Sequence, residues 1–214
     1  MADNRSREEQ DRDQIIGREL KFDSFSSIAI DNGAGAGNAL KHLYSLGHRR
    51  IAFIRGPKTI ADSAPRWEGI CAFAHKASLD LDPDLIVEHA KPFPGYSDAY
   101  QLVQQLLRYK PPFTAIMAFD DLTAFAAIRA LSNAGLRVPD DCSVIGFDDV
   151  AMAAYYNPPL TTVRQPMETM GSISVAILLE AIRTTLKKNA IKPVHRKVVP
   201  RLMIRESTAS PAGK

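Results

Sequence analysis

The sequence has only two cysteines in 214 residues. Cys71 and Cys142 lie far apart and match no metal-ligand spacing, so we interpret them as reduced thiols without a disulfide. No run of 18 apolar residues occurs, and the N-terminus MADNRSREEQDRDQ has no apolar core. These absences argue against a membrane span and a secretory signal, and they predict a cytoplasmic protein.

Signs of an enzyme are also missing. The five histidines form no cluster with metal-ligand spacing, and neither a G-x-S-x-G nor a Walker A motif occurs. GAGAG (Gly33–Gly37) follows a predicted strand, but Asn38 stands at the third position that a dinucleotide loop requires to be glycine. We interpret this segment as a flexible or close-packed helix start. We expect no catalysis, no metal and no cofactor.

The sequence does contain short apolar runs that alternate with helical patterns. The runs predict strands at 27–30, 51–54, 85–88, 114–119, 143–147, 161–163 and 194–205. Apolar residues at helical spacing predict one helix that begins near residue 32. They predict four further helices, at 66–77, 96–109, 121–131 and 167–187. This order predicts an α/β fold with a Rossmann-like, mostly parallel sheet and helices on both faces.

Two pairs of acids follow predicted strands. Asp120 and Asp121 come after 114–119, and Asp148 and Asp149 come directly after 143–147. The carboxyl ends of parallel strands meet at one edge of the sheet, where open α/β folds bind their ligands. Neighbouring acids diverge in direction, so at most one of each pair faces such a site, and ligand hydrogen bonding or helix capping is favoured over catalysis.

Three further residues lie just beyond strand ends on the same side: Asp62, Arg66 and Phe93. Carboxylates accept hydrogen bonds from hydroxyl groups, a guanidinium donates them, and an aromatic ring covers the C–H face of a sugar. This set of side chains predicts a site for a polyhydroxylated ligand.

Three long motifs give the sequence a specific resemblance. They are SSIAIDNGAGAGNALKHLYSLGHRRIAFIRGP, TAIMAFDDLTAFAAIRALSNAGLRVPDDCSVIGFDDVAMAAYYNPPLTTVRQPMETMG and RLMIREST, and they run almost without a break from Ser26 to Thr208. Together they resemble the effector-binding region of the LacI/GalR family of bacterial transcription regulators. That family's fold is similar to periplasmic sugar-binding proteins, with two Rossmann-like subdomains and a cleft between them.

The resemblance implies a division of the chain into subdomains. It assigns 1–25 to a disordered or untyped arm, 26–30 and 161–192 to remnants of an N-terminal subdomain, 31–160 and 193–208 to a C-terminal effector-binding and dimerisation subdomain, and 209–214 to a tail. The family's helix-turn-helix is not recognisable, so we expect an N-terminally truncated regulator. Its helix 167–187 would then carry an apolar face that is exposed or self-associates (Met170, Ile173, Ile177, Leu178 and Ile182).

The resemblance also implies roles for single residues. Arg66 in PRWEGI is similar to the arginine that bridges ligand hydroxyls or carboxylates, Phe93 to the aromatic that stacks on the ligand, and Asp148 to the ligand-binding acid. Asp120 stands where many members have asparagine, a departure that bears on ligand preference. Two further ligand-binding candidates follow from the resemblance: Met167 lies where other members place an aromatic or apolar cleft residue, and Asp62 is carried over from a variable loop.

Subunit contacts are implied for the helix after Asp120 and for the loop 151–156, with ordinary core packing as the alternative for the helix. The residues concerned are Leu122, Phe125, Tyr155 and Tyr156. The sequence thus predicts a dimeric repressor that senses a small carbohydrate-like effector and reaches operator DNA only through a longer chain. The alternative is a stand-alone sugar-binding protein of a transport system. An enzyme acting on a sugar is a third option, for which the sequence offers no positioned base and nucleophile.

Overall fold

The chain divides into two units in the computed structural model. Unit 1 comprises Met1–Asp31 and Pro166–Val199, and unit 2 comprises Asn32–Gln165 and Pro200–Lys214. In the part of the chain that the structure describes, no helix is both long enough and apolar enough to cross a membrane. The described residues are 14–17, 25–109, 112–186 and 192–212.

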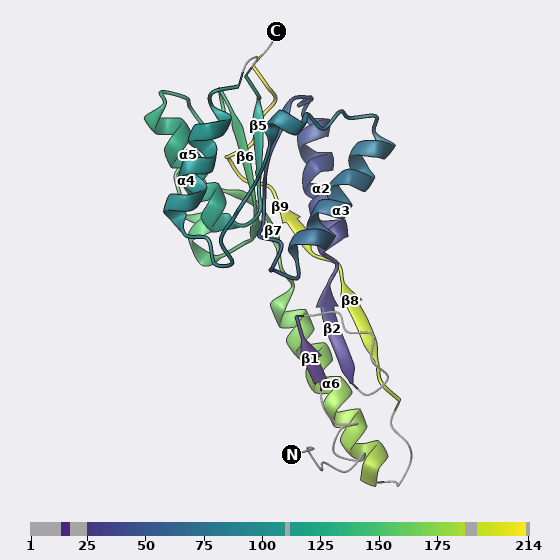
Figure 1. Cartoon of the computed structure of the whole chain (residues 1–214). Helices are drawn as coiled ribbons and strands as arrows, with labels where there is room; N and C mark the ends of the chain where they lie inside the picture. The colour runs from purple at the N-terminus through teal and green to yellow at the C-terminus, as the bar shows by residue number, and fades with distance from the viewer. Residues whose placement is uncertain (1–13, 18–24, 110–111, 187–191, 213–214) are drawn as a thin grey trace. The chain divides into compact units, whose positions relative to one another are not determined.

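Unit 2 is built on a six-stranded sheet with the order β4-β3-β5-β6-β7-β9 (Figure 1). Its neighbouring strands are parallel, except that β9 runs antiparallel to β7. The central strands are apolar and buried along nearly their whole length, as expected for strands covered on both faces. The strands are β3 (Ile51–Arg55), β4 (Ile86–Glu88), β5 (Ala115–Ala118), β6 (Ser143–Asp148), β7 (Thr161–Arg164) and β9 (Arg201–Met203).

Two helices cover each face of this sheet (Figure 1). Successive residues of β3 alternate between the two cores, so Phe53 packs with α2 and α3, whereas Ile54 packs with α4 and α5. The helices are α2 (Asn32–Ser45), α3 (Ser63–Lys76), α4 (Tyr96–Leu106) and α5 (Asp121–Asn133), and short 3₁₀ turns occur at η1 (Pro83–Leu85) and η2 (Ala151–Ala154).

Glycines allow α2 and α3 to approach closely. The GAGAG segment lies in the first turns of α2. A Cβ atom on Gly69 of α3 would stand 2.1 Å from the carbonyl oxygen of Gly33, and a Cβ on Gly37 would stand 3.2 Å from the carbonyl oxygen of Gly69. These glycines therefore serve helix packing, in agreement with the interpretation of GAGAG as a close-packed helix start.

Unit 1 contains a three-stranded parallel sheet with the order β1-β2-β8 and one long helix, α6. Met170 of α6 packs with Ile28 and Ile30 of β2 in a small buried cluster. The elements are β1 (Gln14–Ile16), β2 (Ser26–Ile30), α6 (Met167–Leu186) and β8 (His195–Val198).

The apolar residues of α6 occupy two faces rather than the single face predicted. Met170, Ile173 and Ile177 pack with β2 and Val198. Leu178 and Ile182 instead lie with other exposed aliphatic side chains of the helix. The helical spacing of Leu178 and Ile182 is compatible with either face, so only the packing separates the two groups.

The subdomain boundaries fall elsewhere than the resemblance implied. β7 is hydrogen-bonded to β6 and β9, so 161–165 belong to unit 2. β8 pairs with β2, which places 193–199 in unit 1. The extended segment predicted over 194–205 is therefore two strands of two sheets, divided at Pro200, because a proline cannot donate to a strand ladder.

The ends of the chain also differ from the prediction. In the arm assigned to 1–25, Gln14–Ile16 pairs with β2, whereas 1–13 and 18–24 lie outside the described residues. Ala209, at the start of the assigned tail, exchanges hydrogen bonds with Ser143 and accepts one from Nε2 of His48. The fold class itself, a parallel α/β sheet with helices on both faces, is confirmed.

Candidate functional site

Arg66 is the centre of a charged cluster at the carboxyl edge of the unit 2 sheet. It lies in the first turn of α3 and is only 6% exposed. Its Nη1 donates to the carbonyl oxygen of Phe119 at 2.7 Å, and its Nη2 donates to Oδ1 of Asp148 at 3.4 Å. Phe119 directly follows β5 and Asp148 ends β6, so the arginine joins two neighbouring strand ends.

Asn32 and Asp62 complete the polar contacts of Arg66. Nε of Arg66 donates to Oδ1 of Asn32 at 3.0 Å, and Nδ2 of Asn32 donates to Oδ1 of Asp62 at 3.1 Å. Oδ2 of Asp62 also lies 3.7 Å from Nη2 of Arg66. A guanidinium only donates and an ionised carboxylate only accepts, so these contacts fix the orientation of the Asn32 amide.

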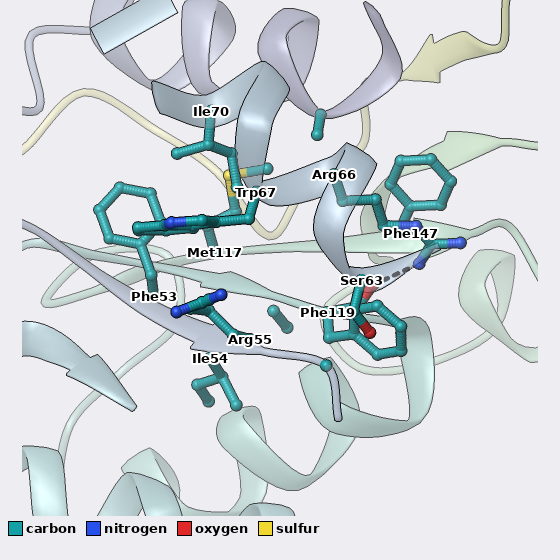
Figure 2. A pocket seen from close by; sticks show the side chains of 13 residues that line it. Phe53, Ile54, Arg55, Ser63, Arg66, Trp67, Ile70, Met117, Phe119 and Phe147 are labelled. Atoms are coloured by element: carbon teal, nitrogen blue, oxygen red, sulfur yellow. Dashed lines mark hydrogen bonds between the residues drawn. The ribbon is translucent and has the colours of Figure 1, made fainter. Parts of the chain in front are cut away.

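Two phenylalanine rings flank the guanidinium (Figure 2). Cζ of Arg66 lies 3.7 Å from the ring centroid of Phe147 and 4.7 Å from that of Phe119, close enough for cation–π attraction. Burial lowers the pKa of Arg66, while the carboxylates of Asp148, Asp62 and Asp120 oppose this shift. An arginine nevertheless keeps its charge in a protein, so the cluster presents a fixed, largely dehydrated cation.

Asp148 is held by contacts on two sides. Besides Arg66, the amide Nε2 of Gln165 donates to its Oδ1 at 2.5 Å. Burial raises the pKa of Asp148, and Arg66 and Gln165 counteract that rise. The backbone φ of Asp148 is +120°, and that of Asp149 is +55°. Such conformations cost on the order of 1–3 kcal/mol for a residue with a Cβ, and they concentrate at functional sites.

The second acid of each pair turns away from Arg66. Asp149 accepts hydrogen bonds from Arg164 and Arg205, and its side chain is almost fully buried. Asp121 accepts from the hydroxyl of Thr162 and, at 2.9 Å, from the backbone N–H of Val150. Both acids therefore bond to β7 and to a segment that follows β6 or β9.

A small cavity lies beside Arg66 between α3 and the sheet (Figure 2). Its volume of about 20 Å³ is room for roughly one water molecule. Mostly apolar side chains line it, including Trp67 and Met117. The cavity is too small for a sugar or a nucleobase.

The structure brings together three of the six predicted ligand residues, namely Asp62, Arg66 and Asp148. Asp120 lies at the end of β5, where its carboxylate accepts from the backbone N–H of Thr123 at 2.7 Å and caps α5. Its charge also acts on Arg66 and Asp148.

The other two predicted ligand residues are exposed. Phe93 lies on the loop between β4 and α4, and its side chain is 88% exposed. Met167 belongs to unit 1, where it begins α6 and is 61% exposed. Their roles as ligand contacts stay predictions.

Sequence reasoning missed four residues of the cluster. Phe119 and Phe147 directly precede the acids Asp120 and Asp148, and Gln165 directly follows β7. The rule that selects polar residues beyond strand ends would have found Gln165 and also Asn32, the second residue after β2. No sequence signal shows that Asn32 contacts Arg66, because 34 positions separate them.

The predicted dimer residues form two groups. Leu122 and Tyr155 are exposed in the single chain. Phe125 is buried and stacks on Tyr156 with ring centroids 4.4 Å apart, and the Tyr156 hydroxyl donates to the carbonyl oxygen of Phe125 at 3.3 Å. Phe125 and Tyr156 therefore pack with each other inside the chain, and the role of all four residues as dimer contacts stays a prediction.

Comparison with known proteins identifies the fold family. The family of periplasmic binding protein-like domains matches residues 40–208. The chain belongs to this family. Its relatives and structural neighbours further show that it is a LacI-family effector-binding domain.

The curated relatives are transcription regulators. The HTH-type transcriptional repressor PurR of Aliivibrio salmonicida is 37% identical over 173 residues, which cover 80% of this chain and 51% of that repressor. PurR of Pasteurella multocida is 34% identical over 172 residues, which cover 80% of this chain and 49% of the relative. The chain therefore spans about half the length of these relatives. Because they are repressors, the prediction of a non-enzyme holds at the level of the family.

Solved structures agree with this assignment. The transcriptional regulator CelR in complex with cellobiose is 33% identical with a TM-score of 0.78, and the match covers 91% of this chain and 58% of CelR. A LacI-family regulator from Enterococcus faecium with bound ribose is 28% identical with a TM-score of 0.77, covering 92% and 70%.

Proposed function

We propose that this chain is the effector-sensing part of a LacI-type transcription regulator and that it binds a small sugar-like ligand at Arg66 and Asp148. The observation that carries the proposal is the Arg66–Asp148 contact, a buried guanidinium and a carboxylate placed side by side at the carboxyl edge of the sheet. A polyhydroxylated ligand can accept from the first and donate to the second.

The sugar-like class is supported by the chemistry of the cluster and by the cellobiose and ribose bound in two structural neighbours. Phe93 adds an exposed ring that can cover the apolar face of a sugar. A planar nucleobase could use the same ring and the same charged pair, so nucleobases belong in the test.

Titration calorimetry of the chain with cellobiose, ribose, glucose, adenine and guanine tests the proposal. We expect one of the sugars to bind, and we expect Arg66→Lys and Asp148→Asn each to weaken that binding roughly 10- to 100-fold, because each removes a charge-assisted hydrogen bond. Asp80→Asn, at an exposed position of unit 2, is the matched control and should leave the affinity unchanged.

Binding of guanine or adenine without any sugar would replace the sugar-like class by a nucleobase. Sugar binding that survives both Arg66→Lys and Asp148→Asn would place the site elsewhere in the chain.

We further infer that the domain pairs with a second copy through Leu122 and Tyr155. Tyr155 is 84% exposed, and an aromatic ring with a polar tip is typical of an interface. We expect Tyr155→Ser to raise the dimer dissociation constant in analytical ultracentrifugation at least about tenfold. Ile204→Ser, an exposed apolar residue elsewhere on unit 2, is the control. A chain that is monomeric without any substitution would contradict the pairing.

Operator binding is proposed only for a longer chain that supplies a helix-turn-helix, and a cytoplasmic location follows from that role. We expect no operator-specific gel shift from these 214 residues at nanomolar concentration. The alternative, a sugar-binding protein of a transport system, is less favoured because the named curated relatives are repressors.

A further inference from the structure

The α6–β8 groove is a hollow in unit 1 between the helix α6 and the edge strand β8. Its volume is about 800 Å³, within the range of roughly 300–1,000 Å³ that small-molecule sites occupy. Every residue that lines it belongs to unit 1, whereas the proposed effector contacts, Arg66 and Asp148, belong to unit 2. The groove is therefore a second candidate site, independent of the proposed function.

The groove arises from the way α6 lies on the small sheet. α6 packs mainly over β1 and β2, and β8 lies on the other side of β2 (Figure 1). In the register of β2 with β8, Ile28 is the partner of Arg196 and Ile30 is the partner of Val198. Partner residues point to the same face of a parallel sheet, and Ile28 and Ile30 pack against α6. The side chain of Arg196 therefore points to the helix-facing side of β8, where it lines the groove.

Aliphatic side chains supply most of the surface along the helix. The residues of α6 that line the groove recur at helical spacing from 173 to 184, so they form one row along the helix. The helix rises about 16 Å over these positions, which is long enough to lie along a hydrocarbon chain of medium length. The aliphatic lining residues are Ile173, Ala176, Ile177, Ala181 and Val194.

The charges in the groove are two cations and one carboxylate. Lys192 and Arg196 line it together with Glu180, and these three described residues form no ion pair with one another. The groove therefore carries a net positive charge. Ser26 adds a hydroxyl group, which accepts from the backbone N–H of Val194 at 3.1 Å and can still donate.

We propose that the α6–β8 groove binds a small amphipathic carboxylate, with its hydrocarbon part along α6 and its carboxylate on Arg196 and Lys192. A guanidinium offers a carboxylate two parallel N–H donors, and a lysine adds a point charge. The hydrocarbon part leaves water when it lies on the aliphatic row. Glu180 opposes an anion and would favour an amine, so the charge of the head group is the feature to test.

Three probes with the same eight-carbon chain and different head groups test the proposal: octanoate, octanol and octylamine. Each is titrated into the whole chain below the concentration at which it forms micelles, and backbone amide resonances are followed by NMR. We expect octanoate to shift resonances within 173–184 and 192–198. We expect it to bind at least about tenfold more tightly than octanol or octylamine, because only octanoate forms charge-assisted hydrogen bonds with the two cations.

Substitution of Arg196 separates head-group recognition from apolar contact. Arg196→Gln should weaken octanoate binding about tenfold and leave octanol binding unchanged, because it removes the charge and keeps most of the side chain. Arg183→Gln is the matched control, since Arg183 is an exposed arginine of α6 that does not line the groove. It should leave the affinity for both probes unchanged.

Filling the groove tests the position of the hydrocarbon chain. Ala176 lines the groove and is exposed, so Ala176→Trp should weaken octanoate binding at least about tenfold by occupying the space. Val175 is exposed but does not line the groove, and Val175→Trp is the control that should not weaken binding.

Several results would overturn the proposal. Equal affinity for octanoate and octanol would show apolar contact without recognition of the carboxylate, and tighter binding of octylamine would show that Glu180 selects a cation. Octanoate shifts confined to Val175, Leu179 and Ile182 would place the probe on the other side of α6. The absence of any octanoate binding would also contradict the site.

Discussion

The two units differ in how completely their helices are covered. α5 of unit 2 buries most of its side chains, including the carboxylate of Asp121 in its first turn. α6 of unit 1 is longer and also rich in aliphatic residues, yet one side of it is exposed. The exposed aliphatic side chains of α6 are Val175, Leu178, Leu179, Ile182 and Leu186.

The spacing of the exposed side chains is informative. Val175, Leu179, Ile182 and Leu186 follow one another at intervals of four, three and four residues, the spacing typical of a seam between helices. Apolar composition alone therefore does not say whether a helix is buried. A second layer of structure has to lie over it, and α5 has such a layer in unit 2 whereas this side of α6 is exposed to solvent.

Matched leucine truncations give the largest expected contrast between the units. Leu131 of α5 is fully buried, so Leu131→Ala should lower the free energy of unfolding by about 2–5 kcal/mol through lost burial and a residual cavity. Leu179 of α6 is 49% exposed, and Leu179→Ala should cost less than about 1 kcal/mol. Urea denaturation followed by circular dichroism measures both. Similar costs for the two variants would mean that another surface covers α6 in solution.

Glycine replacements should affect the two units in opposite directions. A Cβ on Gly69 would meet the backbone of Gly33, so Gly69→Ala should force α2 and α3 apart and destabilise the protein by about 1–3 kcal/mol. Gly171 lies inside α6 with no atom within 4 Å of an added Cβ. Gly171→Ala should therefore stabilise by about 0.5–1 kcal/mol through helix propensity. Thermal unfolding gives the signs directly, and a drop in melting temperature for Gly171→Ala would contradict the openness of that side.

Asp121, a buried acid of unit 2, should make the free energy of unfolding depend on pH. Burial raises the pKa of Asp121 to about 7, against hydrogen bonds from Thr162 and Val150 that favour its ionised form. An aspartate in an unfolded chain titrates near pH 3.9, roughly. Between about pH 4 and pH 7 the folded state therefore binds more protons than the unfolded state. From this group alone, the free energy of unfolding should fall with rising pH by at most about 1.4 kcal/mol per unit and stay constant above pH 7.

Asp121→Asn should remove this slope, because an amide does not titrate. The amide keeps the size of the carboxyl group and can still accept from the N–H of Val150, so the fold should be preserved. Urea midpoints at pH 5, 6, 7 and 8, compared between the two proteins, give the contribution of Asp121. Glu168→Gln, at an exposed position of α6, is the control. Parallel pH profiles for the unsubstituted protein and Asp121→Asn would show that Asp121 is ionised throughout this range.

Much of unit 2 could be predicted from local pattern. The strand 143–147 and the helix after Asp120 agree with β6 and α5 to within about two residues at either end, because their apolar periodicity and caps are local. Residues beyond strand ends were expected to meet at one edge of the sheet, and Asp148 does contact Arg66 there. β1 was not predictable, because three residues carry too little pattern and their pairing partner β2 lies beyond them in the chain.

The sequence by itself determined the alternation of strands and helices, the edge at which the polar residues gather, and membership of the family. Only the tertiary structure decided that Asp148 contacts Arg66 whereas Asp120 caps α5, which side of α6 is buried, and how 194–205 divides between two sheets. It also decided that Asn32 and Gln165 hold the charged pair. The physical reason is distance along the chain: periodicity and capping act within a few residues, whereas the contacts of Arg66 join positions 32, 62, 119 and 148.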